Sequence, residues 1–426
     1  MPENNISFKA KCAGMIGNIL EHYDNALFGL LAPFIAPLFF SEKDPITALI
    51  MTYGMLSLGL CARPLGAFFI GWIGDVFGRR SALRVSLIGM ACVTVSIGFL
   101  PTYAQAGVAA PVLLALARVL QNFFAAGESI GGAIFVLEHT ASDKKNIFSG
   151  IYDASSIGGV MLASLAVTLL GYCGKVESHW RILFFAGAST AILGAWLRDR
   201  QPGIKEKNVE RALPSSRKSL WALRVLWRWR SSLLAVIVVS GFSYMIYSLS
   251  FTLMNGFIPL VTAVTKTEVL RANTVLLIFD LLLLPLFGWL ANVVTKERLM
   301  LFAAGFAALS CFPLFMILEN ASFPIVIIMR VALVTLGVAF SATYHSWTQE
   351  LIPAAHRYTI ISVGYAIGSQ LIGAPSVAIS LWLFRQSGWI GAPALCFFIA
   401  ASLAAIVVYK FSKSVSVLAS DLQSGT

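Results

Sequence analysis

The sequence predicts an all-α membrane protein with twelve transmembrane helices in two six-helix bundles and both termini in the cytoplasm. Hydrophobic residues make up 58% of the 426-residue chain and charged residues only 12%, with a mean hydropathy of +0.80. A soluble domain has about 25% charged residues, roughly twice this fraction. Apolar runs of about 20 residues recur along the chain, and in lipid such runs must be helices, because helices satisfy their own backbone hydrogen bonds.

The apolar runs fall into two sets of six with one hydrophilic stretch between them. They lie at about 12–40, 48–74, 81–100, 108–138, 146–171 and 180–198, and then at about 232–264, 270–294, 298–318, 323–350, 358–384 and 389–410. We therefore predict an N-terminal bundle at 1–198, a basic cytoplasmic linker at 199–231, a C-terminal bundle at 232–410 and a cytoplasmic tail at 411–426.

The net charge of +11 follows this topology. With the N-terminus inside, most of the 31 Lys and Arg fall on the cytoplasmic side, as the positive-inside rule requires. The linker is especially basic, and Trp221, Trp227 and Trp229 stand among its cations. Such a stretch is typical of an amphipathic helix on an anionic inner leaflet, the alternative being a nucleic-acid arm. The charges indicate a lipid bilayer as the partner and do not support nucleic-acid binding.

No pattern in the sequence indicates an enzyme. The six cysteines lie in or beside apolar runs without a C-x-x-C spacing, so neither disulfides nor a metal site is expected. The five histidines are dispersed, and no Gly-rich phosphate loop supports direct ATP drive or another cofactor. The first apolar run contains Glu21 and Asp24 and lacks a cleavage pattern, which predicts an uncleaved first span.

A short polar loop joins the second and third runs and contains Gly71, Asp75, Gly78, Arg79 and Arg80. Glycines let two helix ends approach closely, and the aspartate can pair with either arginine or with a helix end. We expect this loop to act in gating, by tying the cytoplasmic ends of the two bundles together in one access state. The alternative is a simple positive-inside anchor.

An internal repeat relates the two halves. Gly288-Trp289 repeats Gly71-Trp72, and nearly the same offset relates Arg330 to Arg118 and Glu350 to Glu138. The second copy of the loop lacks the aspartate, the second glycine and one arginine. In transporters built from two related bundles, the pathway lies at the interface between the bundles. We therefore predict such a pathway here, with Glu138 among its gating residues.

Five ionisable residues of the first half reach similar depths inside apolar runs: Glu21, Asp24, Arg63, Arg118 and Glu128. Asp153, Asp280 and Arg330 also lie in runs, and Asp280 is expected to be protonated, to line water or to pair with Arg330. Charges inside hydrocarbon are expensive, so each is a functional candidate by default. At about 1.5 Å per residue the five residues of the first half lie near the middle of a core roughly 30 Å thick. Acids facing arginines suit a site that binds a carboxylate while one acid carries a proton. The alternative is a set of fixed ion pairs.

The expected roles differ among these five residues. Arg118, and after it Arg63, should hold the carboxylate, because a guanidinium offers a matching fork of donors. Asp24 is the predicted proton carrier ahead of Glu21 and Glu128, since two nearby carboxylates cannot both ionise cheaply in a low dielectric.

Several motifs, spread from the first run to the eleventh, share one resemblance. They include Gly17-Asn18-Ile-Leu-Glu21-His-Tyr23-Asp24, Arg63-Pro64-Leu-Gly66, Arg118-Val-Leu-Gln121, Gly127-Glu128 and Glu350-Leu-Ile-Pro353. Together with the G-x-x-x-D-x-x-G-R-R loop, the chain resembles the metabolite:proton symporter branch of the major facilitator superfamily. We include Tyr23 and Gln121, which stand within these motifs, among the substrate-binding residues.

Members of this branch import osmolytes such as proline and betaine, or organic acids such as 2-oxoglutarate, citrate and shikimate, together with protons. The resemblance implies a multi-pass symporter of the inner cell membrane that moves a small carboxylate-bearing metabolite or zwitterionic osmolyte by alternating access, working as a monomer. His22, Asn25 and Asn122 depart from the usual residues of the branch, which leaves the solute open. The alternatives are a metabolite exchanger of the same fold and a membrane sensor that does not transport.

Overall fold

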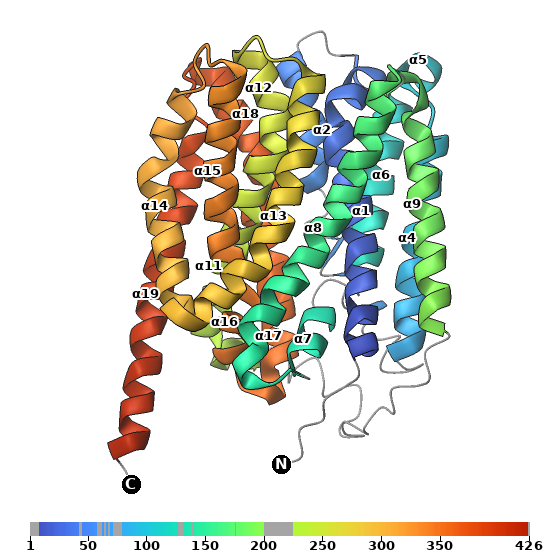
Figure 1. Ribbon diagram of the computed structural model, residues 1–426. Coiled ribbons are helices and arrows are strands. Elements are labelled where there is room, and N and C mark those ends of the chain that lie inside the picture. The colour runs from blue at the N-terminus through green and yellow to red at the C-terminus, as the bar shows by residue number, and fades with distance from the viewer. Residues whose placement is uncertain are drawn as a thin grey trace.

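The computed structural model describes residues 8–41, 45–57, 62–63, 65–66, 69–70, 79–126, 131–138, 140–174, 176–199 and 225–424. Within these residues every regular element is a helix, and the helices stand side by side in an upright bundle (Figure 1). Seven helical stretches of the described chain are long and apolar enough to cross a membrane, and shorter apolar helices accompany them. This arrangement confirms the predicted all-helical membrane fold, while the count of twelve spans stays a prediction.

The first half of the chain supplies α1 (Phe8–Phe39), α2 (Pro45–Ser57), α4 (Arg79–Phe99), α5 (Tyr103–Ala106), α6 (Ala109–Ala125), α7 (Gly131–Glu138), a 3-10 turn at Ser142–Lys144, α8 (Lys145–Tyr172) and α9 (Val176–Asp199). In this half α1 packs against α8 and α9, and α4 packs against α6 and α9. Phe28, Phe39 and Trp180 fill the core between them and are fully buried.

The second half supplies α11 (Arg230–Tyr247), the π-helical segment η2 (Ser248–Leu253), α12 (Met254–Val261), α13 (Lys266–Val294), α14 (Lys296–Met316), α15 (Phe323–Ser341), α16 (Tyr344–Glu350), α17 (Ala354–Ile367), the π-helical segment η3 (Gly368–Gly373), α18 (Pro375–Ser387) and α19 (Ala394–Ser424). Here α11 packs against α15, α17, η3 and α19, and α14 packs against α19. The π-helical segments widen two helices that face the first half, a feature often found at functional sites.

Local sequence signals explain several helix ends. At the start of α13, the Thr265 side chain accepts a hydrogen bond from the Glu268 amide, and the Glu268 carboxylate accepts one from the Thr265 amide at 2.8 Å. This reciprocal pair satisfies two amides that the helix leaves free. α18 ends at Gly388, whose φ of 64° lies in the left-handed region that glycine tolerates.

Among the described helices, the most extensive contacts between the two halves are those of α8 with α13 and of α2 with α18. Glycines permit the first of these contacts, in which α8 and α13 run side by side at the centre of Figure 1. A Cβ atom at Gly150 would lie 2.4 Å from the Leu284 carbonyl oxygen, and one at Gly288 would lie 2.7 Å from the Asn146 carbonyl oxygen. Since real side chains do not approach backbone so closely, only glycine allows this packing.

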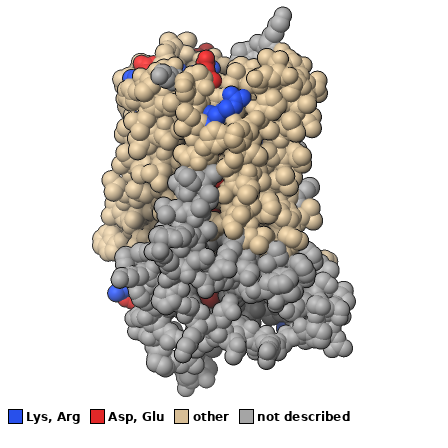
Figure 2. Space-filling view, turned by 90° about the vertical axis from the view of Figure 1, so that its right-hand side faces the viewer, with Lys and Arg blue, Asp and Glu red and all other residues tan. Residues whose placement is uncertain are grey.

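The surface carries the signature of a lipid environment. Large apolar side chains are strongly exposed in the middle of helices, among them Leu309 at 79% and Leu282 at 68%. Figure 2 shows charged side chains near the ends of the molecule and a broad uncharged belt on the described surface between them. A protein in water would not expose such a belt, whereas a bilayer about 30 Å thick requires one.

The polar loop falls largely outside the described residues. Gly71, Asp75 and Gly78 are not among them, and neither is Glu128. Arg79 and Arg80 open α4. The roles predicted for these residues stay predictions.

Candidate functional site

A chain of hydrogen bonds links an arginine to an acid inside the first half. Arg118 on α6 donates to the side-chain oxygen of Gln121, one turn along the same helix. The Gln121 amide donates to the Thr94 hydroxyl at 2.9 Å, and Thr94 on α4 donates to Asp24 Oδ2 at 3.0 Å. All four side chains are buried, with exposures of 0–1%. We call this chain of Arg118, Gln121, Thr94 and Asp24 the relay.

Both charged ends of the relay keep one atom without a hydrogen-bond partner in the described chain: Arg118 Nε and Asp24 Oδ1. The Arg118 guanidinium also lies over the ring of Phe28, 4.5 Å from its centroid, which favours the cation. Gly187 on α9 backs the acid, because a Cβ atom there would lie 2.5 Å from Asp24 Oδ1. The relay thus occupies a tight, water-poor space with unused capacity for a polar ligand at each end.

Arg63 and Glu21 form a direct ion pair beside the relay. Arg63 Nη2 lies 3.2 Å from Glu21 Oε1, and Arg63 Nε donates to Asn122 Oδ1 at 3.3 Å. Asn122 is held in turn by its bond to the Arg118 carbonyl at 3.0 Å. Removing one partner of such a buried pair costs several kcal/mol, about 3–5 in typical cases. Of the two arginines, Arg118 therefore has the less neutralised charge.

The side chain of Tyr23, a predicted substrate contact, turns toward α9. Its hydroxyl donates to the Leu183 carbonyl at 3.2 Å, and the ring is 7% exposed. Three residues before Glu21 on α1, Asn18 donates to Ser155 at 2.9 Å and to Ser156 at 2.7 Å, which fixes α1 against α8. The structure therefore places Gln121 in the relay and Tyr23 at a helix contact.

A second group of polar side chains lies between the halves, and we call it the acidic aromatic cluster. Its members are Asp153 on α8, Tyr247 on α11, Asp280 on α13, Tyr344 and His345 on α16, and Tyr365 on α17. His345 Nε2 lies 2.9 Å from Asp153 Oδ1, and the Tyr247 hydroxyl donates to Asp280 Oδ1 at 3.3 Å. Asp280 Oδ2 and the Tyr344 hydroxyl have no partner in the described chain.

Arg330, the repeat counterpart of Arg118, has a different environment. Its Nη2 donates to Asn273 Oδ1 at 2.5 Å and to the Ser250 carbonyl at 3.1 Å, and its Nη1 donates to the Val269 carbonyl at 3.3 Å. In the described part of the chain Arg330 forms no ion pair with Asp280. Arg330 ties α15 to α13 and to the π-helical segment η2, so it acts as a structural clamp.

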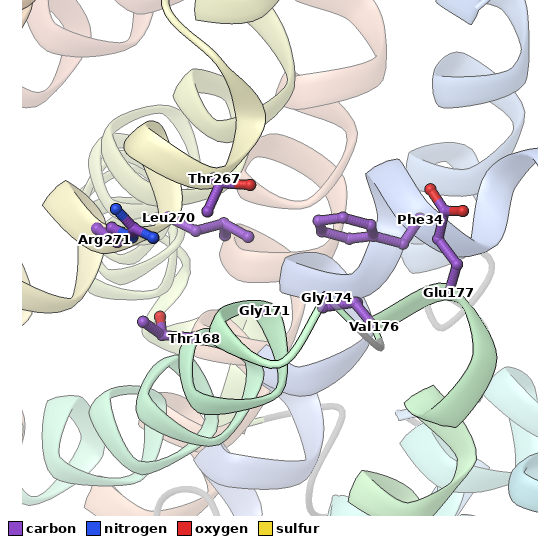
Figure 3. A pocket seen from close by; sticks show the side chains of 9 residues that line it. All are labelled: Phe34, Thr168, Gly171, Gly174, Val176, Glu177, Thr267, Leu270 and Arg271. Carbon is purple, nitrogen blue, oxygen red and sulfur yellow. The ribbon is translucent and has the colours of Figure 1, made fainter.

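A pocket opens between the halves at the upper end in Figure 1, away from the relay. Phe34 of α1, Thr168 of α8 and Glu177 of α9 line one side, and Thr267 and Arg271 of α13 line the other (Figure 3). Below the pocket, hydroxyl groups of the two halves form hydrogen bonds with each other. The Thr274 hydroxyl of α13 lies 3.0 Å from the Thr168 hydroxyl and 2.8 Å from the Ser164 hydroxyl, both on α8. None of the predicted site residues lines this pocket.

Comparison with known proteins decides the family. Residues 15–264, more than half of the chain, match the model of the Major Facilitator Superfamily. The chain belongs to this superfamily. The predicted resemblance is therefore confirmed, and with it the expectation of a multi-pass transporter of the cell membrane that is not an enzyme.

Two named relatives are transporters of proline and betaine. The chain is 27% identical over 393 residues to the glycine betaine/proline/ectoine/pipecolic acid transporter OusA of Dickeya dadantii, covering 89% of this chain and 78% of that one. It is 26% identical over 392 residues to the proline/betaine transporter of Salmonella typhimurium, with the same coverage. Among solved structures, a D-xylose-proton symporter shares the fold, with a TM-score of 0.74, 15% identity and coverage of 95% and 97%.

At the lower end of this superfamily fold the halves are joined by polar contacts. Glu138 on α7 pairs with Arg357 on α17, Oε1 to Nη1 at 3.3 Å. Asn146 on α8 accepts from Ser346 on α16 at 2.7 Å and donates to Asn292 on α13 at 2.9 Å. The charge pattern predicts that this end faces the cytoplasm, and these contacts join the two halves there.

The repeat partner of Glu138 also forms an ion pair. Glu350 on α16 pairs with Lys296 at the start of α14, and Lys296 lies 3.9 Å from Glu297 as well. Lys296 belongs to the eroded second copy of the polar loop. The pair of Glu350 and Lys296 lies within the second half. Glu138 of the first half, by contrast, contacts Arg357 of the second half.

Proposed function

We propose that the chain is a proton-coupled symporter that imports a small zwitterionic osmolyte, such as proline or betaine, by alternating access between its two halves. The named relatives support the solute class, since proline and betaine are what the names of both proteins state. The single observation that carries the coupling is the relay, which joins a carboxylate-binding arginine to a buried acid through two neutral side chains.

The relay supplies a physical reason for coupling. Its donors all point from Arg118 toward Asp24, so the ionised acid is the final acceptor and balances the arginine. When Asp24 takes up a proton, Arg118 loses that balance in a medium where an unpaired charge is costly. A carboxylate from the solute then restores it through a charge-assisted bond. Proton and solute therefore favour each other's binding.

The pathway follows the interface between the halves. We propose that the upper pocket lined by Phe34, Thr168 and Arg271 is the outer entrance, and that the inner end opens when the contacts of Glu138 and Asn146 break. Asp75, Arg79 and Arg80 are proposed to tie the same inner ends together. We also propose that the two bundles have the predicted boundaries, 1–198 and 232–410, and that the protein works as a monomer.

The decisive experiment is transport by the purified protein in proteoliposomes. With an inward proton gradient, labelled proline or glycine betaine should accumulate, an ionophore should abolish accumulation, and solute addition should make the medium more alkaline. Accumulation of 2-oxoglutarate, citrate or shikimate in place of the zwitterions would refute the solute class. Exchange of solute without proton movement would identify an exchanger, and binding without transport a sensor.

A further inference from the structure

We propose that the acidic aromatic cluster binds the cationic group of the transported zwitterion, with Asp280 as its counter-charge, while Arg118 holds the carboxylate. This inference rests on the proposed function and assigns the second pole of the solute. The cationic group is either an ammonium or a compact quaternary ammonium, and both are recognised by a carboxylate together with aromatic faces.

Asp280 is the first observation. The side chain is completely buried, its Oδ1 accepts only the Tyr247 hydroxyl, and its Oδ2 has no hydrogen-bond partner in the described chain. Among the described residues no Lys, Arg or His forms an ion pair with it. Burying a carboxylate without a partner is expensive, so an acid kept in this position is suited to a cation that arrives with the ligand.

Aromatic rings in the cluster are the second observation. Tyr247, which bonds Asp280, stacks on Phe251 with ring centroids 6.0 Å apart and planes at 13°. Tyr344 and Tyr365, whose ring centroids lie 6.5 Å apart, both interact electrostatically with Asp153, and the Tyr344 hydroxyl is buried without a partner in the described chain. The faces of such rings attract cations, and they do so more strongly when water is excluded.

The third observation relates the arginines of the first half to the acids of the cluster. Tyr365 interacts electrostatically with Arg63 and Glu21 of the first half and also with Asp153 of the cluster. Asp153 in turn interacts with Asp280. Tyr244, one turn before Tyr247, interacts with Arg118. The basic groups of the first half and the acidic groups of the cluster are therefore linked electrostatically through Tyr365 and Asp153, which is the arrangement that the two ends of a zwitterion require.

Asp153 is the weaker candidate for the counter-charge. Its Oδ1 already lies 2.9 Å from His345 Nε2, and the ring of Tyr152 packs edge-on against that histidine with centroids 5.3 Å apart. Asp153 therefore already has a hydrogen-bond partner in His345, whereas Asp280 Oδ2 has none in the described chain. For this reason Asp280 is the proposed counter-charge.

The test compares glycine betaine with 3,3-dimethylbutyrate, its isostere in which a neutral carbon replaces the charged nitrogen. Binding to the purified wild-type protein should favour glycine betaine by at least about tenfold, because only glycine betaine offers a cation to the acid and the rings. In Asp280→Asn this preference should fall to about threefold or less, while affinity for the isostere is retained. Glu319→Gln, an exposed acid beyond the end of α14, serves as the matched control and should behave as the wild type.

Each outcome separates the inference from the proposed function. If wild type binds glycine betaine and D280N keeps the full preference, the inference fails and the proposed function stands. The same holds if D280N keeps the preference but no longer accumulates solute with protons, since Asp280 is then a proton carrier. If wild type binds no zwitterion and transports a dicarboxylate, both fail. Should D280N not fold, Tyr247→Leu decides: an unchanged preference after removal of its ring overturns the proposal.

Discussion

Asp24 stands at the accepting end of the relay, and its charge is the one that coupling must remove and restore. Asp24→Asn fixes a neutral side chain that resembles the protonated acid. We expect this variant to lose accumulation against a gradient while it still exchanges solute across the membrane, because counterflow needs no proton release. Uptake and counterflow in the same proteoliposomes measure both.

Glu21→Gln is the matched comparison for that variant. Glu21 neutralises Arg63 at 3.2 Å, so its loss should lower thermal stability more than it changes coupling. Proton-driven accumulation by D24N would contradict the assignment, and loss of coupling in E21Q instead would transfer the role to Glu21. Glu128, which lies outside the described residues, belongs in the same assay.

Arg118 differs from a lysine in the fork of donors that it offers. Arg118→Lys keeps the charge but loses the planar guanidinium that both bonds Gln121 and lies over Phe28. Solute affinity should fall about tenfold or more despite the conserved charge. Equilibrium binding of labelled solute checks this, with Arg330→Lys as the control at the repeat position. The control should reduce the melting temperature and leave affinity within about twofold, since Arg330 contacts backbone carbonyls and Asn273.

At this scale the sequence predicted that Glu21, Asp24, Arg63 and Arg118 lie buried among the helices, because each stands inside an apolar run. Their roles stay predictions. The sequence did not predict which charges meet. The pairing of Arg63 with Glu21 and the connection of Arg118 to Asp24 depend on helix positions that no spacing fixes. Thr94 had no signal at all, since threonine is common in membrane helices and its hydroxyl usually bonds its own helix.

Among the elements, the contact between α1 and α8 depends on one glycine. A Cβ atom at Gly159 would lie 2.1 Å from the Ile19 carbonyl oxygen, whereas one at the adjacent Gly158 would meet only Leu281 Cδ1 at 3.8 Å. Gly159→Ala should therefore destabilise the protein by roughly 1–3 kcal/mol. Gly158→Ala should be neutral or slightly stabilising, because alanine favours the helix. Thermal unfolding in detergent compares the pair, and equal melting temperatures would contradict the close contact.

The apolar runs predicted where helices lie and missed how they are broken. The run at 323–350 is two helices, α15 and α16, and the run at 358–384 contains the π-helical segment η3. Hydropathy is the same on both sides of such breaks. The segment η3 packs closely against α11 of the same half, as at Gly368, where a Cβ atom would lie 2.3 Å from the Ile237 carbonyl oxygen. That information is absent from a single run of residues.

For the whole molecule, the pair of Glu138 and Arg357 joins the two halves, and in the proposed function it helps to hold the inner end closed. Both side chains are partly exposed, so the pair is worth at most about 1 kcal/mol. Glu138→Gln should shift the balance toward an open inner end by up to about fivefold. Distances between spin labels on Ser142 and Arg298, two exposed positions at this end, measure the shift.

Non-additivity is the sharper criterion for this pair. Glu138→Gln and Arg357→Gln should have no more effect together than either has alone, if they remove the same contact. Lys296→Gln breaks a pair within the second half and should leave the label distances unchanged. Fully additive shifts would mean that the two residues act separately on the closed state.

The relay and its neighbouring ion pair also have an electrical consequence. Glu21, Asp24, Arg63 and Arg118 sum to zero when all are ionised. A zwitterion and one proton add a single positive charge to the loaded carrier, whatever the charge of Asp280. Each transport cycle then moves one positive charge inward, so the membrane potential should favour uptake, and each 100 mV is worth about 2.3 kcal/mol of accumulation. Solute added to proteoliposomes on a solid-supported membrane should evoke an inward positive current that D24N lacks, and silent uptake by the wild type would show that a compensating ion travels with the proton.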